Sequence, residues 1–292
     1  MFRSLNEIEY IRTLRFSTGI SELDWIYFGE DDNWGLPRGK ISLWSGPSGC
    51  GKSRSLISLA KNMSRAGHKV IYFQNEVNLS DFRSWSGNEP LSPTLYASDT
   101  TSLMGQLSDI EESGATLAII DSIGFIDEFK TGHETNVKHI YKHYRELCKR
   151  TGVHVIFVCQ LNGSYQIKGS TSILYDADIS VDLDRYIIDK KIVKNHFTIG
   201  INGRNGGKHR YGQMGDGIMT LWEYSPGGAV CISDNRLEDE IWCDAHGIEV
   251  REKPEVPYGH LNEPVKCPTT GMLFFPADPK FFKKGMFQCG ND

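Results

Sequence analysis

Apolar residues along the chain form short runs, and these alternate with segments in which apolar positions recur three and four residues apart. The runs predict strands at residues 40–46, 68–76, 115–122, 153–161 and 176–183. The periodic segments 53–67 and 137–152 are typical of helices with one buried face. Strands that alternate with helices indicate βαβ units. We therefore expect an α/β fold with a mainly parallel twisted sheet flanked by helices.

The N-terminal segment carries a weaker helical pattern. Apolar residues recur at near-helical spacing at Leu5, Ile8, Ile11 and Leu14. This predicts a short amphipathic helix in an arm or linker, residues 1–16. The helix either packs on its own domain or docks on a neighbouring subunit, and the pattern leaves both open.

The C-terminal third loses this alternation. The glycine-rich segment from Phe197 to Glu223 predicts hairpins at one edge of the sheet. Six prolines between Pro254 and Pro279 leave little room for helices or strands. We expect the main domain to cover 17–233 and an irregular C-terminal tail or small appendage to cover 234–292. Cys243 and His246 in that tail are spaced as a ligand pair could be, but a second tight pair, usual in zinc sites, does not follow.

Composition narrows the class of protein. Of the 292 residues, 39% are hydrophobic and 24% are charged, as in ordinary soluble globular proteins. Apolar runs stay well short of the ~18 residues of a spanning helix, and the charged N-terminus does not resemble a signal peptide. We therefore expect no contact with a membrane. The seven cysteines are odd in number and scattered, which predicts reduced thiols in the cytoplasm. Because the net charge is −5, any contact with nucleic acid has to come from local basic loops.

The sequence "WSGPSGCGKSRS", residues 44–55, contains the pattern G-x-x-x-x-G-K-[ST] between a predicted strand and a predicted helix. In that context the pattern predicts a P-loop, whose backbone N–H groups and helix N-terminus hold phosphates. Lys52 is expected to reach the β- and γ-phosphates of ATP, and Ser53 to hold Mg²⁺. The residues expected to bind the nucleotide are Gly46, Pro47, Ser48, Gly49, Cys50, Gly51, Lys52, Ser53 and Arg54. The alternative is a glycine-rich turn without a ligand.

Polar residues end three of the predicted strands. Asp121 follows four apolar residues, and we expect it beside the P-loop strand as a second Mg²⁺ ligand. Glu76 ends another strand, where it could activate a water for hydrolysis. Gln160 follows a third and could contact the γ-phosphate. The alternatives are a helix cap for Asp121 and a solvated charge for Glu76.

Three further stretches carry a family resemblance. "FSTGISELDW" (16–25) resembles the lead-in of RecA-like ATPases of the RadA/Sms and KaiC type. "GVHVIFVCQLNGSYQIKGSTSILYDADIS" (152–180) resembles DnaB-type replicative helicases and phage primase-helicases, and "IVKNHF" (192–197) resembles the "KNRF" of RadA/Sms. The resemblance covers roughly residues 17–223 and implies a RecA-like P-loop NTPase fold.

The resemblance also implies roles for individual residues. Glu76 matches the catalytic glutamate, Gln160 the γ-phosphate sensor, and Lys194 the lysine that reaches a neighbour's nucleotide. The loop 162–172 matches the central DNA-binding loop. Its expected contacts to DNA are Asn162, Tyr165, Lys168 and Gly169. The implied partners are single-stranded DNA, other copies of the chain in a ring, with a hexamer expected, and replication or recombination proteins.

The sequence departs from these families at several points. His196 stands where an arginine is expected, and histidine cannot form the bidentate contacts of a guanidinium. Either Lys194 alone supplies the positive charge to the nucleotide site of the neighbouring subunit, or Arg204 takes over this role. The alternative for Arg204 is an ordinary residue of a hairpin turn. Within these 292 residues we do not expect the helical domain of DnaB or the zinc and protease-like domains of RadA/Sms. Such compact versions resemble phage-encoded ATPases, which would work in the cytoplasm of a host.

Three functions remain open on the sequence. The first is an ATP-driven helicase or translocase on single-stranded DNA, and the second is a recombinase or annealing protein that uses ATP as a switch. The third is a KaiC-like ATPase that acts without nucleic acid, against which the polar loop 162–172 argues.

Overall fold

The computed structural model describes residues 4, 13–27, 35–129, 134–161, 176–188, 191–201, 218–225, 227–234, 265–266 and 273–274. A sheet of eleven strands runs through them. Its parallel part consists, in spatial order, of β8 (Ile179–Ile188), β3 (Ile41–Pro47), β7 (His154–Leu161), β6 (Leu117–Asp121), β4 (Val70–Gln74) and β5 (Leu95–Ser98). From β8 the sheet continues through β9 (Lys191–Ile201), β10 (Ile218–Ser225), β11 (Gly228–Asp234), β13 (Leu273–Phe274) and β12 (Val265–Lys266).

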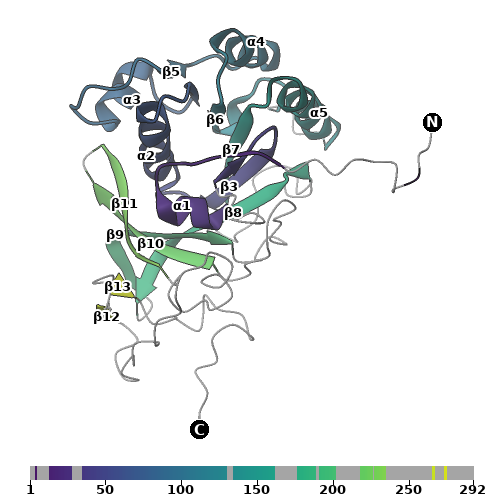
Figure 1. The fold of residues 1–292 in the computed structure, drawn as a ribbon. Helices are drawn as coiled ribbons and strands as arrows, with labels where there is room; N and C mark the ends of the chain where they lie inside the picture. Colours follow the sequence, from purple (N-terminus) through teal and green to yellow (C-terminus); the bar gives the residue numbers. More distant parts are fainter. Residues whose placement is uncertain are drawn as a thin grey trace.

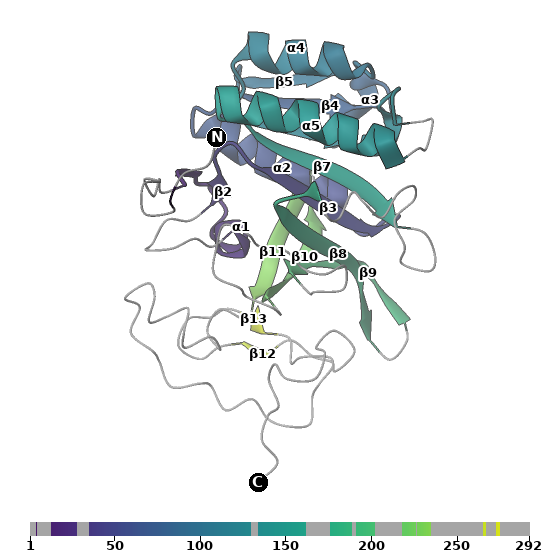
Figure 2. The ribbon, with the colours of Figure 1, turned by 90° about the vertical axis from the view of Figure 1, so that its right-hand side faces the viewer.

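Helices cover both faces of the parallel part (Figures 1 and 2). One buried cluster joins the sheet to α1 (Ser21–Ile26), α2 (Lys52–Arg65) and α3 (Leu79–Trp85). A second cluster joins the opposite face to α4 (Leu103–Ser113), α5 (Glu134–Thr151) and the 3-10 helix η2 (Ile123–Phe125). Strands that are covered on both faces have no solvent-exposed face. All five residues of β6 are therefore buried, including Asp121 at its end. The predicted α/β fold is therefore confirmed.

The antiparallel strands β8, β9, β10 and β11 form a ribbon beside the parallel part. Figure 2 shows β9–β11 below helices α4 and α5. Consecutive strands of this ribbon pair with each other, as the predicted hairpins require. The ribbon also packs on α2 through β11, where Ser58 Oγ donates a hydrogen bond to the Ala229 carbonyl at 2.9 Å. This contact ties the ribbon to the helix that follows the P-loop.

Two details of the predicted sheet are wrong. The strand that ends at Asp121, β6, does not lie beside the P-loop strand β3, because β7 lies between them. The strand predicted for 68–76 ends at Gln74, so Glu76 lies in the loop that follows. The structure also contains α3, β5 and α4, for which no element was predicted. The end signals of α4 are nevertheless present, because Ser102 caps its first turn and Gly114, with φ of 63°, ends it.

The lead-in "FSTGISELDW" forms a compact turn that continues into helix α1 before β3. Asp24 accepts hydrogen bonds from the Thr18 N–H and from Ser17 Oγ, both at 2.6 Å. Leu23 of the same turn is fully buried in the core. This turn therefore explains the threonine, leucine and aspartate of the lead-in as packing and hydrogen-bonding residues.

Several predictions at the two ends of the chain stay open. Residues 5–12 of the predicted N-terminal helix lie outside the described residues, and so does most of the predicted tail. Thr13 and Leu14 are not helical, and Arg15–Phe16 forms β1, which pairs with β2 (Leu36–Pro37). The boundaries at 16 and 233 remain predictions. No helix in the described ranges is long and apolar enough to cross a membrane.

His154, at the start of β7, predicts acid sensitivity of the fold. Its ring is fully buried, with Nε2 2.9 Å from Ser42 Oγ and Nδ1 2.8 Å from the Pro37 carbonyl oxygen. Burial lowers the pKa of His154 to about 4 from 6.5. The unfolded chain therefore binds a proton more readily between these values, and stability is lost as the pH falls from 6.5 to 4. We expect a loss of about 3 kcal/mol in the free energy of unfolding across this window.

Urea unfolding at pH 7 and at pH 4.5 measures this effect. The variant His154→Gln lacks the titrating ring, so its unfolding free energy should change less between the two pH values than that of the unmodified chain. An equal change in both proteins would show that His154 is not the cause.

Candidate active site

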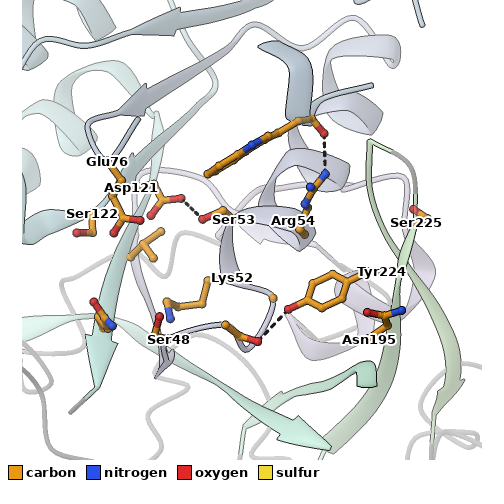
Figure 3. Close-up of a pocket in the computed structure, with 15 residues that line it drawn as sticks. Ser48, Lys52, Ser53, Arg54, Glu76, Asp121, Ser122, Asn195, Tyr224 and Ser225 are labelled. Atoms are coloured by element: carbon orange, nitrogen blue, oxygen red, sulfur yellow. Dashed lines mark hydrogen bonds between the residues drawn. The ribbon is translucent and has the colours of Figure 1, made fainter. Parts of the chain in front are cut away.

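A pocket of about 610 Å³ opens where β3, β6 and β7 end (Figure 3). Its volume lies in the range of pockets that hold small ligands such as nucleotides. Its lining residues are Ser48, Gly49, Gly51, Lys52, Ser53, Arg54, Glu76, Trp85, Asp121, Ser122, Val158, Gln160, Asn195, Tyr224 and Ser225. In open α/β sheets, ligands bind at this carboxyl edge of the strands.

The P-loop connects β3 to α2. Its last residue before the helix, Gly51, has φ of 88°, a conformation that L side chains rarely adopt. Lys52 begins the helix, and its Nζ donates hydrogen bonds to the carbonyls of Gly46 and Pro47, at 2.8 Å each. The first N–H groups of α2 and the Lys52 ammonium therefore lie at one wall of the pocket, as an anionic phosphate chain requires.

Asp121 forms the acidic centre of the site. It is only 2% exposed, and its Oδ2 accepts hydrogen bonds from Ser53 Oγ at 2.6 Å and from the Tyr72 hydroxyl at 2.7 Å. Burial raises the pKa of Asp121, although both hydrogen bonds and the charge of Lys52 oppose the shift. The hydroxyl of Ser53 and the Asp121 carboxylate are hard oxygen ligands that lie side by side in the pocket. This pair fits Mg²⁺, which prefers few protein oxygens together with phosphate oxygens.

Glu76 and Gln160 reach the same pocket from two other strands. Glu76 is exposed just beyond β4, and its N–H donates to Gln74 Oε1 at 2.8 Å. Gln160 is half-buried near the end of β7 and is the register partner of Gly46 on β3. The intervening strand β7 therefore places Gln160 beside the P-loop, while Asp121 comes from the next strand along.

Of the far wall of the pocket, only Arg54 was among the residues predicted to bind the nucleotide. Arg54 Nη1 donates to the Trp85 carbonyl at 2.9 Å, and its guanidinium carbon lies 5.8 Å from the centre of the Trp85 ring. Tyr224 donates its hydroxyl to the Gly49 carbonyl at 3.0 Å, and burial raises the pKa of Tyr224. Figure 3 shows Arg54, Asn195, Tyr224 and Ser225 on the side of the pocket away from Glu76 and Asp121.

Of the wall residues that were not predicted, only Asn195 carried a usable signal in the sequence. It lies inside the stretch 192–197 that resembles RadA/Sms, and its φ of 65° is a conformation that asparagine tolerates better than most residues. Trp85 and Tyr224 come from α3 and β10, which are distant in sequence from the P-loop. Their place in the pocket depends on long-range packing that no local pattern encodes.

The structure brings together most of the residues that were predicted to bind the nucleotide. Six of the nine predicted P-loop residues line the pocket, whereas Gly46, Pro47 and Cys50, also described, do not. Cys50 is buried beneath the loop, and burial raises its pKa. Among the described residues, Lys194 is exposed on β9 and does not line the pocket of its own chain. The predicted residues Asn162, Tyr165, Lys168, Gly169 and Arg204 lie outside the described residues.

The chain is similar to known proteins over this same region. A protein family described as "AAA domain" matches residues 9–163. The "DNA repair protein RadA" of Campylobacter jejuni is 24% identical over 180 residues, which are 60% of this chain and 39% of that protein. The protein of the same name from Mycobacterium tuberculosis is 25% identical over 185 residues, 60% of this chain and 37% of that protein. The one from Helicobacter pylori is 28% identical over 121 residues, 41% of this chain and 26% of that protein.

The chain thus spans less than half the length of these curated relatives. The matched region contains the P-loop, Glu76, Asp121 and Gln160, which line one pocket. The family match covers more than half of the chain, and the sheet has the predicted mainly parallel core. The chain therefore belongs to the AAA domain family and has a P-loop ATPase core of the RecA/DnaB superfamily.

Proposed function

We propose that the protein is an ATP-dependent translocase or helicase on single-stranded DNA that hydrolyses ATP between the subunits of a ring. The observation that carries this proposal is one pocket that joins the P-loop to Glu76, Asp121 and Gln160. Gln160 is followed directly by the predicted DNA-binding loop 162–172. A nucleotide contact and a DNA contact would thus be neighbours in the chain.

Each of these pocket residues has a separate role in ATP hydrolysis. Lys52 and the N-terminus of α2 bind the phosphate chain. Ser53 and Asp121 would hold Mg²⁺, which supplies charge neutralisation on the phosphates. Glu76 is the exposed carboxylate of the pocket and would orient and deprotonate the attacking water. Gln160, beside Gly46, would sense the γ-phosphate.

The ring is supported by the position of Lys194. Because this lysine is exposed on β9 and is not among the residues that line the pocket of its own chain, its ammonium could reach the site of a neighbouring subunit. A hexamer is the expected number of subunits. Arg204 could supply a second cation to the same neighbour. Replication or recombination proteins would be further partners.

Single-stranded DNA should stimulate ATP hydrolysis, and the variant Lys168→Ala should lose most of that stimulation. Removing one phosphate contact weakens binding to DNA and lowers its salt dependence, while the ATP pocket is untouched. ATP turnover measured with and without single-stranded DNA, together with ATP affinity, checks this. Lys142→Ala on the exposed face of α5 is the matched control. Equal stimulation of the unmodified chain, Lys168→Ala and Lys142→Ala would show that loop 162–172 does not couple DNA binding to ATP turnover.

A second candidate is a recombinase or annealing ATPase. The observation that favours it is the name of the curated relatives, which are DNA repair proteins. The same pocket would then use ATP as a switch. A forked duplex separates the two candidates, because unwinding supports the motor, whereas strand annealing or exchange without unwinding supports the switch. The third candidate, a KaiC-like ATPase, would require that the chain bind no DNA at low salt.

A further inference from the structure

Strands β8, β9 and β10 of the ribbon lie directly against the P-loop. A Cβ on Gly46 would lie 2.6 Å from the Leu183 carbonyl oxygen, and a Cβ on Gly51 would lie 2.6 Å from the Phe197 ring. A side chain at either position would force the Leu183 backbone or the buried Phe197 ring to shift, so strands β8 and β9 favour glycine at both positions. The P-loop is therefore packed against the ribbon at both of its ends.

Two polar side chains of the ribbon hold the middle of the loop. Arg185 of β8 donates from Nη2 to the Ser48 carbonyl at 2.6 Å. Tyr224 of β10 donates its hydroxyl to the Gly49 carbonyl at 3.0 Å. The Tyr224 ring is itself held by the Phe197 ring, at 5.1 Å between centroids. Two consecutive carbonyls of the P-loop are thus fixed by donors from two different strands.

Fixing a carbonyl also fixes an N–H group. The peptide unit is planar and trans, so its N–H and its C=O point in opposite directions. The bond from Arg185 to the Ser48 carbonyl therefore sets the direction of the Gly49 N–H. The bond from Tyr224 to the Gly49 carbonyl sets the direction of the Cys50 N–H in the same way. P-loops bind phosphates through such N–H groups, so their direction decides how well the loop fits a phosphate chain.

We propose that Arg185 and Tyr224 are positioning residues that hold the P-loop in its phosphate-binding shape. Arg185 contributes a charge-assisted bond and Tyr224 a neutral one, so Arg185 has the larger effect. The proposal rests on the proposed function, because it assumes that the pocket binds ATP. It assigns a role to Arg185, which is not among the residues that line the pocket.

Binding of a fluorescent ATP analogue with Mg²⁺ tests the proposal. Arg185→Met should raise the Kd about 10-fold and Tyr224→Phe about 3-fold, because each variant removes one hydrogen bond and keeps the bulk of the side chain. Arg185→Lys keeps one donor and should recover part of the loss. Arg150→Met, whose side chain pairs with Glu111 on the surface, and Tyr96→Phe on the edge strand β5 are the matched controls.

A second readout separates positioning from a general loss of structure. The thermal midpoint without nucleotide should stay within about 3 °C of the unmodified chain, because both bonds lie at a partly exposed loop. An unmodified chain that binds no ATP analogue would refute the proposed function itself. If the unmodified chain binds and Arg185→Met and Tyr224→Phe bind equally well, the inference is overturned. Should Arg185→Met not fold, Arg185→Lys and Tyr224→Phe carry the same test.

Discussion

Glu76→Gln is expected to lower ATP turnover about 100-fold or more, because general-base catalysis typically contributes 10²–10⁴ to the rate. The substitution keeps the size and the polarity of the side chain but removes its ability to accept a proton. Glu76 is exposed and is held through its N–H by Gln74, so the fold should be unaffected. The affinity for Mg²⁺-ATP should remain within about threefold, since Glu76 is assigned to the water and not to the phosphates.

Phosphate release and nucleotide affinity, measured on the same preparation, check this separation. Glu112→Gln on α4 is the matched control, because Glu112 is exposed and lies outside the residues that line the pocket. If Glu76→Gln turns over ATP within twofold of the unmodified chain, another residue must act as the general base. A parallel loss of nucleotide affinity would instead place Glu76 among the binding residues.

Asp121→Asn is expected to abolish the dependence of turnover on Mg²⁺ and to lower turnover about 100-fold, because the metal supplies several kcal/mol of charge stabilisation. The same substitution should not weaken the fold. Burial raises the pKa of Asp121, so the ionised carboxylate destabilises the folded state at neutral pH. This cost is present above the raised pKa and disappears as the pH falls below the ordinary value of 3.8.

Two measurements test this combination of effects. Urea unfolding at pH 7 with a chelator should give Asp121→Asn a stability equal to or above that of the unmodified chain. Phosphate release titrated with Mg²⁺ should rise for the unmodified chain and stay flat for the variant. A variant that is clearly less stable would mean that the bonds from Ser53 and Tyr72 need the charged form. A variant that still responds to Mg²⁺ would remove Asp121 from the metal site.

The half of the pocket that contains the P-loop was predictable from the sequence. The P-loop is a contiguous motif, and the residues Glu76, Asp121 and Gln160 each follow an apolar strand. Parallel strands present their carboxyl ends at one edge, so such residues meet whatever the exact order of the strands. This explains why the wrong expectation that β6 lies beside β3 did not displace Asp121 from the pocket.

The other half was not predictable, for a physical reason. Trp85 reaches Arg54 from α3, and Arg185 and Tyr224 reach the P-loop from β8 and β10. Only the packing of α3 and of the ribbon beside α2 and the P-loop brings these residues there. A tyrosine or an arginine in a strand has no local pattern that distinguishes such a contact from an ordinary surface position. The missed helix α4 is different, since its Ser102 cap and Gly114 end were readable signals.

Coupling of ATP hydrolysis to single-stranded DNA by this P-loop ATPase core is the function that we propose. The most direct test is phosphate release from Mg²⁺-ATP by the full chain as single-stranded DNA is added at constant ATP and low salt. We expect measurable hydrolysis without DNA and a saturable increase with DNA. Hydrolysis that stays unchanged at every DNA concentration, or no hydrolysis at all, would contradict it.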